Sequence, residues 1–139
     1  MRRAKQPASE PPAARLLVID DEPDIRTTLR SIFADLGLVV DLASDGLQGL
    51  VLATANRPSV VLVDLTMPEM DGLQFIDACQ ALPSCDGVPI VLMSDEARLA
   101  AVRPYLPATA GVVMLMAKPF DLDALIAVVL RLTRTSSDA

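Results

Sequence analysis

Five polar residues of this sequence stand at, or directly after, the ends of short apolar runs: Asp20, Asp21, Asp64, Ser94 and Lys118. Three carboxylates that come together repel one another, which is costly unless a cation lies among them. Carboxylate oxygens without a histidine or thiolate beside them favour Mg²⁺ over softer metals. If the ends of these apolar runs lie close together in the fold, the sequence predicts a magnesium site.

One ammonium and one hydroxyl beside such a metal would form a site for a phosphoryl group. The metal and Lys118 would neutralise phosphoryl oxygens, while the Ser94 hydroxyl would donate a hydrogen bond to one of them. Lysine is a compact charge that suits a single oxygen, and Lys5 and Lys118 are the two lysines among 12 basic residues. A carboxylate in this place can act as a nucleophile and form an acyl phosphate. Asp64, expected at the centre of the sheet, is the candidate.

The elements that must position these residues alternate along the chain. Apolar runs predict strands at 16–20, 39–43, 59–64, 89–94 and 112–117. Apolar periodicity predicts helices over 24–36, 45–56 and 72–82, a short or distorted helix near 97–102, and a last helix capped by Asp121. This alternation predicts an α/β, doubly wound fold: a five-stranded parallel sheet with helices on both faces. Ligands of such folds bind beyond the carboxyl ends of the strands, where the polar residues stand.

Some side chains carry more specific expectations. In the helix over 45–56, Leu47, Leu50 and Val51 are expected to point inward. Cys79 falls on the apolar face of the helix over 72–82 and is expected to be an inert buried thiol, whereas Cys85 is expected to be a loop thiol. Two cysteines cannot build a disulfide framework, and no redox role is expected for them.

Composition and charge exclude several classes of function. The chain has 139 residues, enough for one domain, and a formal net charge of −6. Residues 16–139 hold 8 basic and 17 acidic side chains, a balance that disfavours binding to DNA or to anionic membranes. No apolar run reaches the ~20 residues of a membrane span. The sequence predicts a disordered basic leader over 1–15, a cytoplasmic domain over 16–134 and a polar tail over 135–139.

The strand-end motifs resemble those of the receiver domain of two-component response regulators, in a stand-alone, CheY-like form. The matching stretches are VIDDE at 18–22, VDLTMPEMDG at 63–72, PIVLMS at 89–94 and KPF at 118–120. The resemblance covers nearly all of residues 16–134. It implies a doubly wound receiver fold with its five parallel strands in the flavodoxin-like order 2-1-3-4-5. It also implies a cis peptide bond at Lys118-Pro119, where an X–Pro bond makes the cis form inexpensive.

The resemblance also assigns a role to each candidate residue. Asp64 would accept the phosphoryl group, and it would ligate Mg²⁺ together with Asp21 and the backbone carbonyl of Thr66. Asp20 would hold waters of the metal. In the same assignment, Ser94 would hydrogen-bond the phosphoryl group and report its presence, and Lys118 would bind a phosphoryl oxygen.

Two positions depart from the pattern of the family. Leu115 stands where receiver domains usually have a tyrosine or phenylalanine that swings inward, so the transition that produces the output is expected to differ or to be muted. Asp95 follows Ser94 where a small residue is usual, and its carboxylate is expected to slow phosphorylation or to control the water that attacks the acyl phosphate.

The resemblance implies a phosphoacceptor module that acts only on its own aspartate. A sensor histidine kinase or a phosphotransfer protein would supply the phosphoryl group, and an unidentified protein downstream would read the result. Homodimerisation is left open, and direct DNA binding is not expected. One alternative is an interaction module that works without phosphorylation, favoured by Leu115 and Asp95. The other is a haloacid-dehalogenase-type phosphatase, but the sequence after Asp64 lacks the second aspartate of that motif.

Overall fold

The computed structural model describes residues 13–106 and 111–138. Most of the predicted leader lies outside the described residues. The strands are β1 (Arg15–Ile19), β2 (Val39–Ala43), β3 (Val60–Asp64), β4 (Ile90–Ser94) and β5 (Val112–Ala117). The helices are α1 (Pro23–Asp35), α2 (Gly46–Ala55), α3 (Gly72–Gln80), α4 (Glu96–Val102) and α5 (Leu122–Asp138), with short 3₁₀ turns η1 (Pro83–Cys85) and η2 (Arg103–Tyr105).

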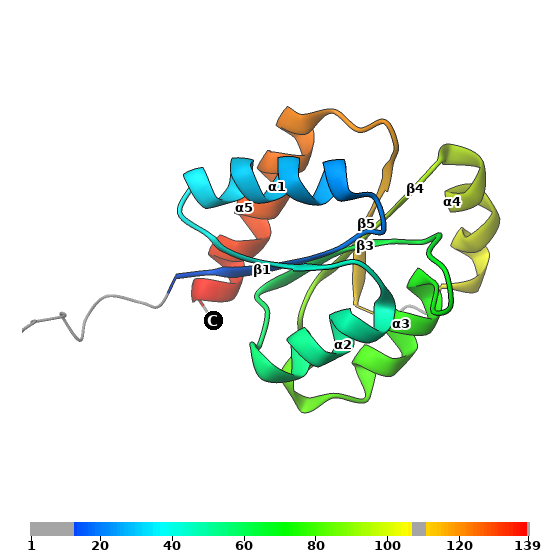
Figure 1. The fold of residues 1–139 in the computed structure, drawn as a ribbon, viewed down its shortest axis with the longest axis horizontal. Coiled ribbons are helices and arrows are strands. Elements are labelled where there is room, and N and C mark those ends of the chain that lie inside the picture. Colours follow the sequence, from blue (N-terminus) through cyan, green and yellow to red (C-terminus); the bar gives the residue numbers. More distant parts are fainter. Residues whose placement is uncertain (1–12, 107–110, 139) are drawn as a thin grey trace, which may run out of the picture.

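The five strands form one parallel sheet in the order β2-β1-β3-β4-β5, which confirms the predicted topology. Helices α1 and α5 cover one face of the sheet, while α2 and α3 cover the other (Figure 1). Because all five strands are parallel, their carboxyl ends lie at the same edge of the sheet, and β3 is the central strand. The predicted site residues stand at this edge.

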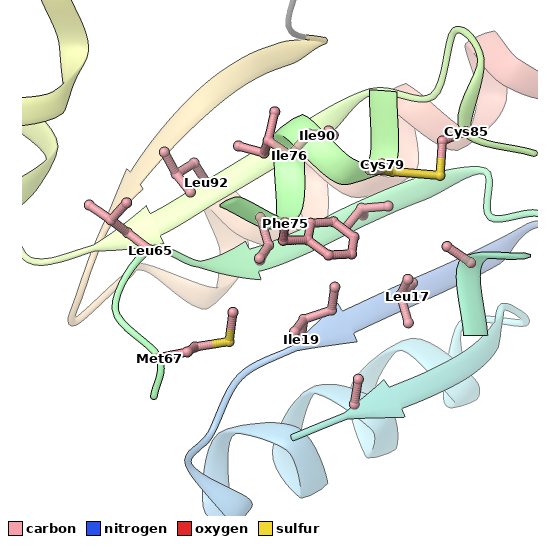
Figure 2. Close-up of a cluster of buried hydrophobic side chains, with 14 of the residues drawn as sticks. Leu17, Ile19, Leu65, Met67, Phe75, Ile76, Cys79, Cys85, Ile90 and Leu92 are labelled. Carbon is pink, nitrogen blue, oxygen red and sulfur yellow. A yellow bond between two sulfur atoms is a disulfide. The ribbon is translucent and has the colours of Figure 1, made fainter. Parts of the chain in front are cut away.

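The hydrophobic core is divided by the sheet into two layers. Leu16 and Val18 of β1 face α1 and α5, where Phe33 is fully buried. Leu17 and Ile19 face the opposite layer, in which Phe75 of α3 is fully buried (Figure 2). All five residues of β3 are buried, as expected for a strand covered on both sides. Asp64 therefore ends a strand that is held from both faces.

The prediction for the inward face of α2 was wrong for two of three residues. Leu47 and Val51 are 54% and 67% exposed, and only Leu50 packs partly against the core. The buried residues of α2 are Gly46, Gly49 and Ala53. A methyl group on Gly49 would lie 2.5 Å from Cδ1 of Ile19, so the small residues bring the helix close to the sheet. This helix is apolar on all sides, and periodicity alone could not identify the side that packs.

The interpretation of the cysteines as separate thiols was also wrong. Cys79, at the end of α3, and Cys85, in η1, form a disulfide bond (Figure 2). The chain turns back after Leu82, where Pro83 opens η1, and this brings the two Cα atoms to 6.0 Å. The two cysteines are six positions apart in the sequence. The bond lies before the start of β4, at the end of the sheet opposite to the strand ends that carry the site.

The region after β4 agrees with the predicted short helix. Helix α4 has seven residues and passes into η2, in which Pro104 ends regular helical hydrogen bonding. Pro107 lies outside the described residues. Helix α5 continues beyond residue 134, where the domain was predicted to end. Within the described part of the chain, none of the helices has both the length and the apolar character needed to cross a membrane.

Replacing Gly72 with alanine should destabilise the fold by about 1–3 kcal/mol, the usual cost of overpacking. A methyl group there would lie 2.7 Å from the carbonyl oxygen of Asp64 and 2.8 Å from Cα of Leu65, both backbone atoms that cannot move aside. Chemical denaturation would measure the loss. Gly46→Ala is the matched comparison, because its methyl would meet the flexible side chain of Met70 at 2.7 Å. An equal loss in both variants would contradict this explanation.

Candidate functional site

The site forms where the carboxyl ends of four strands meet. Asp20 follows β1, Asp64 ends β3, Ser94 ends β4 and Lys118 follows β5. The backbone N–H of Lys118 donates to the carbonyl oxygen of Ser94 at 2.8 Å, which joins the last two strand ends directly. The peptide bond between Lys118 and Pro119 is cis, as the sequence resemblance predicted.

Three carboxylates come together at this edge. Asp20, Asp21 and Asp64 each offer a carboxylate oxygen, and these atoms lie within 4.8 Å of one another. Asp20 is fully buried and Asp64 is 5% exposed, whereas Asp21 faces solvent. The donor set consists of oxygen atoms, with one side open to water, and this arrangement fits Mg²⁺, which prefers oxygen ligands and keeps several waters. The predicted metal-binding carboxylates are therefore adjacent in space.

Lys118 provides the positive charge of the site. Its Nζ donates to Oδ2 of Asp20 at 2.7 Å and lies 3.5 Å from Oδ2 of Asp64 and 3.5 Å from Oε1 of Glu22. Burial opposes the charged form of the ammonium, but the hydrogen bond and charge of Asp20, followed by the charges of Asp64 and Glu22, outweigh this effect. The pKa of Lys118 is consequently raised above its ordinary value of 10.5. The ammonium is therefore charged at neutral pH.

Asp64 has a perturbed acidity. Burial raises its pKa from 3.8 to about 6, with smaller contributions in the same direction from the charges of Asp20 and Asp21. Lys118 and a hydrogen bond from the backbone N–H of Thr66 to Oδ1, at 3.2 Å, act in the opposite direction. Asp64 is thus a buried carboxylate that is largely ionised near neutral pH and lies beside an ammonium. A nucleophile for phosphorus has this character.

Ser94 is 3% exposed and lies at the edge where Asp64 and Lys118 meet. On the other side of the site, Thr66 is exposed and its hydroxyl accepts a hydrogen bond from Nη1 of Arg98 at 2.8 Å. All six site residues named from the sequence therefore fall in one region. Arg98 and Glu22 were missed, because a single charged residue on or before a helix carries no signal that distinguishes it from a solvated surface charge.

The two residues that depart from the family pattern can now be placed. Asp95 caps α4: its Oδ1 accepts from the backbone N–H of Arg98 at 2.8 Å, and its Oδ2 lies 3.3 Å from Nε of the same residue. The carboxylate is thus directed at the first turn of its own helix. Leu115 pairs with Leu92 in the sheet and is partly buried against the layer that contains Phe75.

Comparison with known proteins supports a single family. The chain matches the response regulator receiver domain over residues 16–130. It is 36% identical to Protein Rrf1 of Nitratidesulfovibrio vulgaris over 122 residues, which cover 88% of this chain and 84% of the relative. It is also 36% identical to Response regulator MprA of a Mycobacterium species, where the match covers 88% of this chain and 52% of the relative. The chain thus spans about half the length of that second relative.

A solved structure shows the same architecture. The receiver domain of sensor histidine kinase PA1611 from Pseudomonas aeruginosa, solved with a magnesium ion coordinated in its active site cleft, has a TM-score of 0.76 and 27% identity to this chain. The alignment covers 88% of this chain and 98% of that one. Sequence, topology and strand-end chemistry agree: the chain belongs to the response regulator receiver domain family of two-component signalling systems.

Proposed function

We propose that this domain accepts a phosphoryl group on Asp64, in the presence of Mg²⁺, from a phosphohistidine of a sensor histidine kinase or a phosphotransfer protein. The phosphorylated domain then signals in the cytoplasm by binding a protein partner differently. The observation that carries this proposal is the juxtaposition of the buried Asp64 carboxylate with two further carboxylates and the Lys118 ammonium. The magnesium ion coordinated in the PA1611 receiver domain supports the same use of the carboxylates.

In the proposed reaction, a carboxylate oxygen of Asp64 forms a bond to phosphorus while the bond between phosphorus and the histidine nitrogen breaks. The electron pair of that bond stays on the imidazole, and Asp64 becomes an acyl phosphate. Lys118 would bind one phosphoryl oxygen and Ser94 would donate a hydrogen bond to another. Asp20, Asp21, Asp64 and the carbonyl of Thr66 would hold or orient the metal, which supplies positive charge against the phosphoryl oxygens.

Incubation with a small acyl phosphate and Mg²⁺, followed by intact-mass measurement, tests this function. We expect at most one phosphoryl group per chain, and hydroxylamine should remove it because it attacks acyl phosphates. Rapid multiple-turnover hydrolysis of p-nitrophenyl phosphate would instead favour the phosphatase alternative. If neither labelling nor a response to beryllofluoride, a mimic of the acyl phosphate, were detected, the domain would act without phosphorylation.

Mg²⁺ should raise the melting temperature of the wild-type domain, and Asp21→Asn should weaken Mg²⁺ binding by at least about tenfold, since one charged ligand is lost. The affinity for Mg²⁺ should also fall as the pH drops through about 6, because Asp64, whose pKa is about 6, must lose its proton to bind a cation.

Calorimetric titration at several pH values would measure the affinity of the wild type and of Asp21→Asn, and thermal denaturation would measure the melting temperature. Asp24→Asn removes an exposed charge in the first turn of α1 and should leave the affinity nearly unchanged.

A further inference from the structure

Arg98 connects the loop after β3 to the first turn of α4. Its Nη1 donates to Oγ1 of Thr66 at 2.8 Å, and its Nε lies 3.3 Å from Oδ2 of Asp95. Its own backbone N–H donates to Oδ1 of Asp95 at 2.8 Å, so the cap of α4 and the guanidinium are held by the same carboxylate. One side chain thus spans two segments separated by 32 positions in the sequence.

The contact with Thr66 leads directly to Asp64. The backbone N–H of Thr66 donates to Oδ1 of Asp64 at 3.2 Å, while the hydroxyl of Thr66 accepts from Arg98. A continuous path of hydrogen bonds therefore runs from the carboxylate to α4. Phosphorylation would convert the single negative charge of Asp64 into roughly two. A guanidinium is strongly attracted to phosphoryl oxygens, with which it can form paired hydrogen bonds.

Arg98 has the freedom to respond to such a change. Its side chain is 56% exposed, and its partner Asp95 is 54% exposed, so the pair between them is weak and screened by water. A guanidinium carries five N–H donors, and the contacts with Thr66 and Asp95 use Nη1 and Nε. A stronger negative charge at Asp64 can therefore draw the guanidinium inward and weaken its contact with Asp95.

Helix α4 is itself held loosely. Among its seven residues, all of them described, Leu99 alone is buried. An open surface groove of about 380 Å³ lies between α4, the loop after β3 and α3, and Thr66, Leu73, Arg98 and Val102 contribute to its walls. With so little buried apolar surface, α4 has a low cost of displacement. Leu99 and the partly buried Val102 pack α4 against the core, and Arg98 adds a hydrogen bond to the loop after β3.

We propose that Arg98 is a positioning residue that couples the phosphorylation state of Asp64 to the position of α4, through Thr66. This inference rests on the proposed function, since it requires a phosphoryl group at Asp64. It also offers a route from the site to the surface in a chain that carries Leu115 where its family has an aromatic residue. The exposed Tyr105, which follows α4 in η2, would move with that helix.

Amide NMR with beryllofluoride and Mg²⁺ tests the coupling in the full chain. In the wild type, we expect shift changes both around Asp64 and along α4. In Arg98→Ala, the changes around Asp64 should remain and those along α4 should be lost, whereas Arg98→Lys should restore part of them because lysine can reach one partner at a time. Arg103→Ala removes an exposed arginine from η2 and should respond like the wild type.

The outcomes separate the coupling from the phosphoacceptor function. If α4 responds fully in Arg98→Ala, the coupling is refuted while the function of Asp64 stands. If the wild type shows no change around Asp64, the proposed function itself fails and the coupling with it. Thr66→Val removes the same hydrogen bond without altering α4. A retained α4 response in that variant would also refute the coupling, even if Arg98→Ala unravelled the helix.

Discussion

Asp64→Asn is expected to abolish incorporation of the phosphoryl group and, at the same time, to stabilise the metal-free domain by roughly 2–3 kcal/mol near pH 7. Labelling is lost because the amide cannot act as the nucleophile. The protein is stabilised because asparagine, like a protonated aspartate, carries no charge into a site that disfavours one. A rise in the pKa of Asp64 from 3.8 to about 6 corresponds to about 3 kcal/mol.

The stabilisation has a defined dependence on pH. Because the folded state holds the Asp64 proton more tightly than the unfolded state, the wild type loses stability as the pH rises from about 3.8 to about 6. Above that window both states have released the proton and the cost stays constant. The advantage of Asp64→Asn should therefore be small near pH 4, grow through this window and level off, as denaturant titrations at several pH values would show.

Saturating Mg²⁺ should reverse the order of stability. The wild type should gain binding energy from the cation, while the variant lacks one of the three clustered carboxylates that would hold it. Asp45→Asn is the matched control: it also removes one negative charge, and asparagine can still cap α2 as Asp45 does. This control should be labelled normally. Labelling of Asp64→Asn by a phosphorylated kinase would refute Asp64 as the phosphoacceptor.

The sheet and the positions of the site residues followed from the sequence because both depend on short-range rules. Strands that are apolar on both faces pack in parallel sheets, and helices that alternate with them return the chain to the same side each time. The carboxyl ends of the strands are therefore expected to lie at one edge of the sheet. Asp20, Asp64 and Lys118 stand at such ends, and the structure brings Nζ of Lys118 to 2.7 Å from Asp20 and 3.5 Å from Asp64. The chemistry of these three residue types is specific enough to suggest a cation and a phosphoryl group before any distance is known.

Other features depend on packing that a linear pattern does not record. Leu47 and Val51 face outward because Gly49 allows α2 to approach Ile19, and a helix that is apolar on all sides gives no indication of this. The disulfide of Cys79 and Cys85 depends on how the chain turns at Pro83. Arg98 acquires its importance from a hydrogen bond to Thr66, 32 positions away. The packing of α2 and the contact of Arg98 depend on segments that are distant in the sequence, whereas the disulfide depends on the conformation of a local turn.

Lys118→Met should abolish phosphorylation and destabilise the metal-free domain by about 3 kcal/mol near pH 7, the scale expected when one partner of a buried ion pair is removed. Asp20 is fully buried and loses the ammonium that lies 2.7 Å from its Oδ2. Lys118 also lowers the pKa of Asp64, so its removal moves that pKa further upward from about 6. Chemical denaturation would measure the loss of stability, and acyl-phosphate labelling would measure the loss of function.

The pH dependence of this loss identifies its cause. If unpaired negative charge is responsible, the difference from the wild type should shrink as the pH falls below about 6 and a proton neutralises Asp64. Mg²⁺ should also reduce the difference near pH 7. Arg30→Met, which removes an exposed positive charge from α1, should cost little at any pH. A loss in Lys118→Met that is constant with pH and insensitive to Mg²⁺ would instead assign Lys118 a packing role. In that case the ion pairs of Lys118 with Asp20 and Asp64 would not contribute to the stability of the fold.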